Sequence, residues 1–233
     1  MTILGLDTAG RTAAVGIVRS GELLYEGFVS AGHTHSETLL PLVDTALAAA
    51  GLGPADIELW GVCAGPGSFT GLRIGLAAVK GLAFVHGAPC AAVPTLQALA
   101  YSCPPGQGTV LAALDARRGE VYWAAFDLAD HSRLTPDAAA PLAALADFIK
   151  NCKKPLFFVG DGAGLCYNGY GFVPGVVPCP PALRTCRGAG VALAAGAMQK
   201  AGQCVPAAQL QPCYLRLSQA ERERLARGQA LQP

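Results

Sequence analysis

Two stretches of this chain carry residue types that could bind a phosphate group. Asp7 and Thr8 end a short apolar segment that reads as a strand. A carboxylate and a hydroxyl on such a turn could face a phosphate, so they are our candidate cofactor-binding residues, as a vestigial phosphate site. A polar hairpin turn would use the same residues. The second stretch, residues 65–68, reads Gly-Pro-Gly-Ser, and its backbone N–H groups could bind an anion.

Neither stretch matches a nucleotide-binding motif. The phosphate loop of nucleoside triphosphatases requires Gly-x-x-x-x-Gly-Lys-Ser/Thr, and no lysine follows a glycine at that spacing. The dinucleotide motif Gly-x-Gly-x-x-Gly fails at Thr70, where the third glycine belongs, and no acidic residue follows about twenty residues later. We therefore interpret residues 65–68 as a tight turn between a strand and a helix.

The spacing of cysteines and histidines does not predict a metal site. Nine cysteines are present, the closest two are seven residues apart, and there is no Cys-x-x-Cys. His33 and His35 are two apart and have no third ligand near them in the sequence. We expect no metal site and no catalytic residue. Buried free thiols fit a reducing compartment, which favours the cytoplasm.

Composition favours a protein that hides apolar surface in a complex. The 233 residues suffice for one large or two small domains. Hydrophobic residues make up 52% and charged residues 14%, although alanine- and glycine-rich codon usage would raise the same figures. The net charge of +1, without a dense Lys/Arg stripe, does not favour unaided nucleic-acid binding. We see no secretory signal, and prolines and glycines interrupt both long uncharged runs, so we expect no membrane span.

Hydrophobic periodicity predicts an α/β chain of two subdomains. The first, residues 1–103, carries three antiparallel strands, a helix at 36–50, a strand at 59–64, a helix at 70–86, a strand at 89–93 and a short helix at 95–101. This order is typical of an actin-like, ribonuclease-H-like (ASKHA) half. A Pro/Gly-rich boundary follows at 103–108. Residues 109–233 are predicted to form a smaller, degenerate C-terminal subdomain that ends in a solvated arm.

The helices at 36–50 and 70–86 are too apolar to be buried by one sheet face alone. We predict that both pack against equivalent helices of a partner. Gly71, Gly75 and Ala78 fall on one helical face, where we expect another helix to approach closely. A Gly75→Arg change should then break the contact and leave the monomer folded. The predicted interface residues are Leu39, Leu42, Val43, Ala46, Gly71, Leu72, Gly75, Ala78, Val79 and Leu82.

Four motifs resemble one protein family. They are Ile-Leu-Gly-Leu-Asp-Thr (3–8), Ala-Gly-Pro-Gly-Ser-Phe-Thr-Gly-Leu-Arg-Ile-Gly (64–75), Leu-Asp-Ala-Arg-Arg-Gly-Glu-Val-Tyr-Trp (114–123) and Tyr-Leu-Arg-Leu-Ser-Gln-Ala-Glu-Arg (214–222). Together they resemble the TsaB (YeaZ) family. The resemblance implies a non-catalytic subunit that binds and activates the catalytic paralogue TsaD, which transfers threonylcarbamoyl to an adenosine beside the tRNA anticodon.

The resemblance also implies where cofactors and partners bind. ATP or ADP and a metal are expected on TsaD, and no cofactor is expected on the isolated chain. The ATPase subunit TsaE and tRNA would join only through the complex, and the chain would form a homodimer when alone.

Two enzyme classes are alternatives. A metal-dependent, glycopeptidase-like hydrolase would need the His-x-x-x-His pair of the catalytic paralogue, but Thr95 and Leu99 stand at the matching positions, and leucine cannot bind a metal. An actin-fold small-molecule kinase would need a second phosphate turn after Asp115, where two arginines stand instead. Both alternatives are therefore disfavoured.

Overall fold

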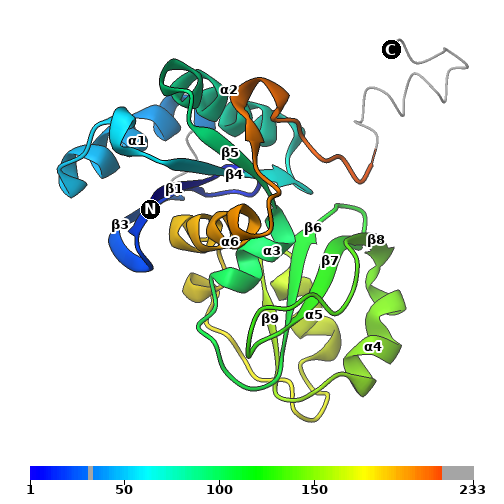
Figure 1. Cartoon of the computed structure of the whole chain (residues 1–233). Coiled ribbons are helices and arrows are strands. Elements are labelled where there is room, and N and C mark those ends of the chain that lie inside the picture. Colours follow the sequence, from blue (N-terminus) through cyan, green and yellow to red (C-terminus); the bar gives the residue numbers. More distant parts are fainter. Residues whose placement is uncertain (31–33, 217–233) are drawn as a thin grey trace, which may run out of the picture.

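The chain forms two mixed β-sheets with helices between and around them (Figure 1). The computed structural model describes residues 1–30 and 34–216. In Figure 1, helices α3 and α6 lie between the two sheets, while α1 and α2 cover the far side of the first sheet. The two-subdomain α/β architecture predicted from the sequence is confirmed.

The first sheet has six strands in the order β10-β5-β4-β1-β2-β3. Strands β1, β2 and β3 form an antiparallel meander, and β4 and β5 continue the sheet parallel to β1. This is the arrangement that the predicted strand and helix order requires. The strand bounds are β1 Thr2–Asp7, β2 Ala13–Arg19, β3 Glu22–Val29, β4 Leu59–Gly65, β5 Pro89–Pro94 and β10 Val205–Pro206.

Helices α1 (His35–Ala50) and α2 (Phe69–His86) cover one face of the first sheet. A capping box begins α1, in which the Thr34 N–H donates to the Glu37 carboxylate at 3.2 Å. The Ser68 hydroxyl accepts from the Gly71 N–H at the start of α2. Glycines in the left-handed conformation end both helices, at positions 51 and 87. The predicted bounds of both helices are thus correct to within two residues.

Helices α3 (Thr95–Tyr101) and α6 (Gly188–Lys200) cover the other face of the first sheet. The α6 backbone lies almost directly on the sheet, because Gly5 and Gly16 carry no side chain beneath it. An added Cβ at Gly16 would lie 2.3 Å from the Ala189 nitrogen. Although α6 and β10 belong to the range 109–233, they therefore pack with the first subdomain.

The second sheet has four strands in the order β8-β7-β6-β9. Its strands are β6 Thr109–Asp115, β7 Glu120–Asp127, β8 Ala138–Pro141 and β9 Leu156–Val159, and its helices are α4 Ala146–Asn151 and α5 Ala163–Tyr170. Four short 3-10 helices complete the described elements, at Pro54–Asp56, Leu142–Leu145, Pro181–Leu183 and Ala207–Gln209.

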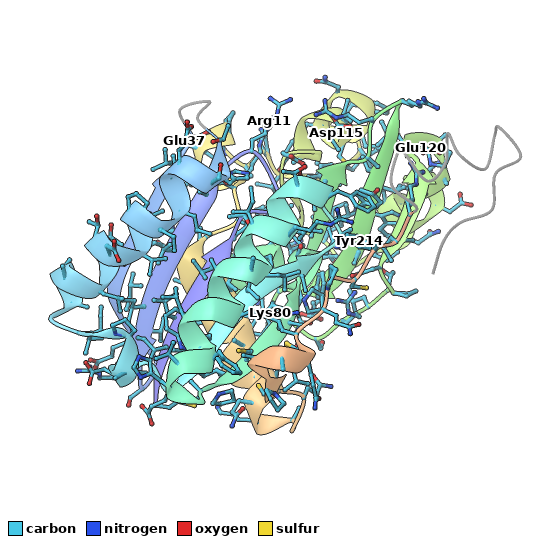
Figure 2. All side chains as sticks on the ribbon, turned by 90° about the horizontal axis from the view of Figure 1, so that it is seen from above. Arg11, Glu37, Lys80, Asp115, Glu120 and Tyr214 are labelled. Carbon is cyan, nitrogen blue, oxygen red and sulfur yellow. The ribbon has the colours of Figure 1, made fainter. Side chains whose placement is uncertain are left out.

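Residues 207–216 connect the two subdomains along one side (Figure 2). The Tyr214 ring stacks on Phe69 with centroids 4.3 Å apart, and its hydroxyl accepts from Arg73 Nε at 3.1 Å. Arg216 pairs with Glu120 on β7. The start of the predicted solvated arm is therefore packed against the protein. The rest of the arm, residues 217–233, lies outside the described residues, as does His33.

Helix α2 is long and apolar enough to cross a membrane by length and composition, and no other helix within the described part of the chain meets that test. Six of its residues are buried: Gly71, Leu72, Gly75, Leu76, Val79 and Ala83. Because core helices also meet this criterion, the finding does not indicate a membrane span.

The cysteines differ in exposure, and we expect thiol reagents to distinguish them. Cys213 is exposed, whereas Cys63, Cys90, Cys166 and Cys186 are buried. Burial raises the pKa of Cys90 to about 11 and that of Cys166 to about 12. Since the thiolate is the reactive form, a thiol reagent at neutral pH should label Cys213 first and only a minority of the nine cysteines. Mass mapping tests this, and rapid labelling of all nine in folded protein would refute it.

Candidate functional site

Asp7 lies at the carboxyl end of β1, buried where the two subdomains meet. Its side chain accepts a hydrogen bond from the Ala9 N–H at 2.9 Å, and the residue is 1% exposed. Burial raises the pKa of the Asp7 carboxyl above its ordinary value. The Thr8 hydroxyl donates to the Gly71 carbonyl oxygen at 2.7 Å and so fastens the turn to α2. In the described structure these two residues do not form an open phosphate site.

A cavity of 130 Å³ lies beside Asp7, between the subdomains. Pockets that enclose organic ligands are about 300–1,000 Å³ in volume, so this cavity is too small for a nucleotide. Thr95 and Leu99 line it. These are the positions where the resemblance places the metal ligands of the catalytic paralogue, and they are occupied by a hydroxyl and an alkyl side chain.

Charged residues from both subdomains line this cavity, with Arg11 from the first and Asp161 from the second. Asp161 accepts a hydrogen bond from the Asp115 N–H at 2.9 Å, and Asp115 accepts one from the Arg117 N–H at 2.7 Å. Arg117 and Arg118 both have left-handed backbones, with φ of 66° and 56°. The Asp115 carboxylate therefore stabilises the turn that follows it by accepting the Arg117 N–H. The two arginines of this turn occupy the positions where a kinase would need a phosphate-binding turn.

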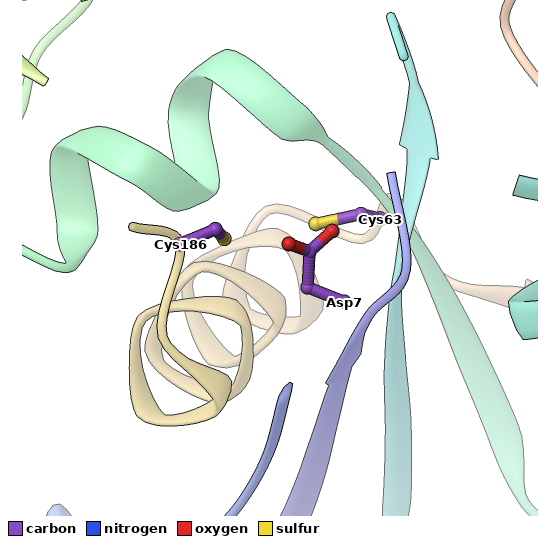
Figure 3. A group of neighbouring side chains, drawn as sticks. All are labelled: Asp7, Cys63 and Cys186. Atoms are coloured by element: carbon purple, nitrogen blue, oxygen red, sulfur yellow. The ribbon is translucent and has the colours of Figure 1, made fainter. Parts of the chain in front are cut away.

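Cys63 and Cys186 lie next to Asp7, a juxtaposition that the sequence analysis missed (Figure 3). Cys63 is on β4 and Cys186 precedes α6. The three ligand atoms lie within 4.8 Å of one another. Burial raises the pKa of Cys63 well above its ordinary value. No short-range spacing could have revealed this cluster, because its members come from three distant segments.

The structure places most of the predicted interface residues inside the chain's own core. Leu39, Val43, Ala46, Leu72 and Val79 are each no more than 1% exposed. Leu42, Ala78 and Leu82 are half-buried beside the same core.

The two predicted interface glycines also face inward. An added Cβ at Gly71 would lie 2.0 Å from the Thr8 carbonyl oxygen, and one at Gly75 would lie 2.4 Å from the Thr8 hydroxyl. The Gly71–Gly75 face of α2 therefore packs on the turn after β1, and no partner helix can approach it in this fold.

The opposite face of the two helices is exposed and carries several apolar side chains, beside the charged residues Asp44 on α1 and Arg73 on α2. Helices α1 and α2 lie side by side over the sheet in Figure 2. Leu40 on α1 is 49% exposed, and Phe84 and Val85 on α2 are 73% and 74% exposed. Ala77 and Gly81 on α2 are also exposed, and an added Cβ at Gly81 would meet no described atom within 4 Å. We call Leu40, Ala77, Gly81, Phe84 and Val85 the outer helix face.

A groove lies at one end of the outer helix face, between the starts of α1 and α2. Its volume is 640 Å³, and Thr34, Ser36, Ser68 and Thr70 contribute hydroxyl groups to its lining, together with Arg11. The N-termini of two helices carry partial positive charge there. This end of the surface is therefore polar, in contrast to the apolar residues at the far end of α2.

Comparison with known proteins identifies relatives over most of the chain. The family model described as "TsaD: tRNA N6-adenosine threonylcarbamoyltransferase" matches residues 26–167. The tRNA threonylcarbamoyladenosine biosynthesis protein TsaB of Bacillus subtilis is 31% identical over 71% of this chain and 73% of its own length. The protein of the same name from Escherichia coli is 38% identical over 54% of this chain and 55% of its own length.

Solved structures agree with these sequence matches. YeaZ from Pseudomonas aeruginosa superimposes with a TM-score of 0.75 at 29% identity, over 92% of this chain and 99% of that chain. The activator of the 2-hydroxyisocaproyl-CoA dehydratase from Clostridium difficile has a TM-score of 0.51 at 13% identity, over 87% of this chain and 97% of that chain. The second likeness concerns the fold alone, and the predicted actin-like, ribonuclease-H-like class is confirmed.

Proposed function

The chain belongs to the TsaB family of tRNA threonylcarbamoyladenosine biosynthesis proteins, and from this premise we propose that it is a non-catalytic subunit that binds and activates the catalytic paralogue TsaD. The outer helix face is the observation that carries this proposal. An exposed apolar surface rimmed by polar residues is typical of a protein–protein interface. Large residues at such a surface supply most of the binding energy, and Phe84 is the largest residue there.

The residues between the subdomains support a non-catalytic role. Asp7 is buried, the Thr8 hydroxyl is bonded to α2, and the adjacent cavity is too small for a nucleotide. We therefore assign ATP or ADP and the catalytic metal to TsaD. In this proposal TsaE and tRNA join through the complex, the chain works in the cytoplasm, and the outer helix face forms a homodimer when TsaD is missing.

Gly81→Arg is expected to weaken TsaD binding at least about a hundredfold, because it puts an unpaired charge into an apolar contact. The monomer should stay folded, since position 81 is open and arginine favours a helix more than glycine does. Titration calorimetry with TsaD from the same organism measures the affinity, and a threonylcarbamoyl-transfer assay measures the activation. The chain alone should show no transfer.

Gly164→Arg is the matched control, because Gly164 lies on α5, away from the outer helix face, and also has open space around it. We expect it to bind TsaD normally. A folded Gly81→Arg protein with wild-type affinity would exclude the outer helix face from the interface. A wild-type chain that neither binds TsaD nor stimulates transfer would refute the proposed function itself.

A further inference from the structure

The cluster of Asp7, Cys63 and Cys186 has the chemistry of a site for a transition metal. The carboxylate and both sulfur atoms lie within 4.8 Å of one another, and Figure 3 shows the two sulfur atoms on either side of the carboxylate. All three residues are buried, with exposed fractions of 1%, 0% and 6%. Ligand atoms on one zinc ion, at about 2.0–2.3 Å from it, lie less than about 4.6 Å apart. The cluster therefore needs little adjustment to close around an ion.

We propose that Asp7, Cys63 and Cys186 bind one zinc ion, with a fourth position open to the adjacent cavity. Thiolates select soft or borderline metals, and two cysteines with a carboxylate form a suitable three-ligand set for zinc. Magnesium and calcium require six or more oxygen ligands, which this cluster does not supply. The inference goes beyond the proposed partner role and does not depend on it.

Thr95 provides an independent indication of a ligand at this position. Its hydroxyl is buried and has no hydrogen-bond partner within residues 1–30 and 34–216, although the residue is only 1% exposed. It lines the same 130 Å³ cavity as Asp7 and Cys186. A buried hydroxyl without a partner is costly. A zinc-bound water in the cavity would give it one and would complete a tetrahedral site.

The surroundings permit the ion to enter. Two thiolates and one carboxylate carry three negative charges against the two positive charges of zinc. Arg11 and Asp161 both line the cavity, and their opposite charges offset each other. Arg11, Ser30 and Asp161 are exposed and also line the cavity, so it opens to solvent there. Zinc binding releases the two thiol protons to solvent.

The ion would link the end of β1, the middle of β4 and the residue two positions before α6. Binding to the folded state alone raises stability. The simplest alternative is that the two thiols donate hydrogen bonds to Asp7, since both lie within reach of its carboxylate. That alternative leaves the Thr95 hydroxyl without a partner and predicts no metal retention.

Cobalt and zinc titrations of the full, reduced, metal-stripped chain test the proposal. One Co²⁺ per chain should bind, with thiolate-to-cobalt charge-transfer absorption and tetrahedral d–d bands that equimolar Zn²⁺ removes. Cys63→Ser, Cys186→Ser and Asp7→Asn should each weaken zinc binding at least about tenfold. Cys90→Ser is the control, because Cys90 is a buried cysteine on β5 outside the cluster, and it should leave stoichiometry and spectrum unchanged.

X-ray absorption at the zinc edge keeps the test decisive even where a variant does not fold. In the wild-type chain it should count two sulfur ligands and two lighter ligands. The proposal is overturned when folded wild-type protein gives no cobalt–thiolate absorption, when the zinc shell holds four sulfurs or none, or when folded Cys63→Ser and Cys186→Ser proteins bind zinc as tightly as the wild type.

Discussion

Gly75→Arg is expected to abolish folding of the first subdomain, in contrast to the effect predicted from the sequence alone. An added Cβ at this position would lie 2.4 Å from the Thr8 hydroxyl and 3.3 Å from Val62 Cγ2. The arginine would also carry an unpaired charge into the core, which costs several kcal/mol. Because domains are stable by only about 5–15 kcal/mol, we expect little folded protein. Circular dichroism and thermal melting measure the loss.

Gly81→Arg provides the comparison, because it makes the same chemical change on the exposed face of the same helix. It should melt close to the wild-type temperature. If Gly75→Arg also melted at the wild-type temperature and bound TsaD weakly, α2 would have to be rotated relative to the described structure. The Gly71–Gly75 face would then be the interface after all.

The bounds of α2 could be predicted from sequence, but its orientation could not. Ser68 and Gly87 are local end signals, so the helix was expected where it is found. Its faces are harder to distinguish, because small and apolar residues occur all round it, with glycines at both 75 and 81. The orientation of α2 is set by Thr8, whose hydroxyl donates a hydrogen bond to the Gly71 carbonyl oxygen although the two residues are more than sixty positions apart in the sequence. Such a distant contact leaves no periodic signal in the helix.

In the second subdomain, too, local elements could be predicted from the sequence but contacts between distant segments could not. Strands β6 and β7 can be recognised from the sequence as two apolar segments joined by a short turn. The return of α6 and β10 to the first sheet was not predicted, since sequence order suggested that residues 109–233 stay together. Glycines at 5, 16 and 188 permit that return by bringing backbones into contact. A glycine's partner across such a contact cannot be identified from one sequence.

The buried cluster was missed for a related reason. Asp7 was singled out because it ends a strand, and the cysteines were judged by their mutual spacing. Metal motifs are recognised when ligands share one helix or turn. Here each ligand comes from a different element, and only the fold of the first subdomain brings Cys63 and Cys186 to Asp7.

Gly16→Ala is expected to cost about 3 kcal/mol or more, although it adds only one methyl group. The added carbon would lie 2.3 Å from the Ala189 nitrogen and 2.4 Å from the Gly188 carbonyl carbon. Both are backbone atoms at the start of α6, so no flexible side chain can move aside. Helix α6 would have to lift from the sheet and lose close packing along its length. Because each kcal/mol shifts Tm by about 2–4 °C in a chain of this size, calorimetry should record a large fall.

Gly81→Ala adds the same single carbon in open space, and it should stabilise the protein where Gly16→Ala destabilises it. Alanine is favoured over glycine in a helix by about 0.5–1 kcal/mol, and no described atom lies within 4 Å of the added carbon. Tm should therefore rise slightly, while TsaD binding, measured in parallel, should change far less than with Gly81→Arg. Equal melting temperatures for Gly16→Ala and the wild type would mean that α6 does not rest on the backbone of β2. In that case the contact that returns α6 to the first sheet would need another explanation.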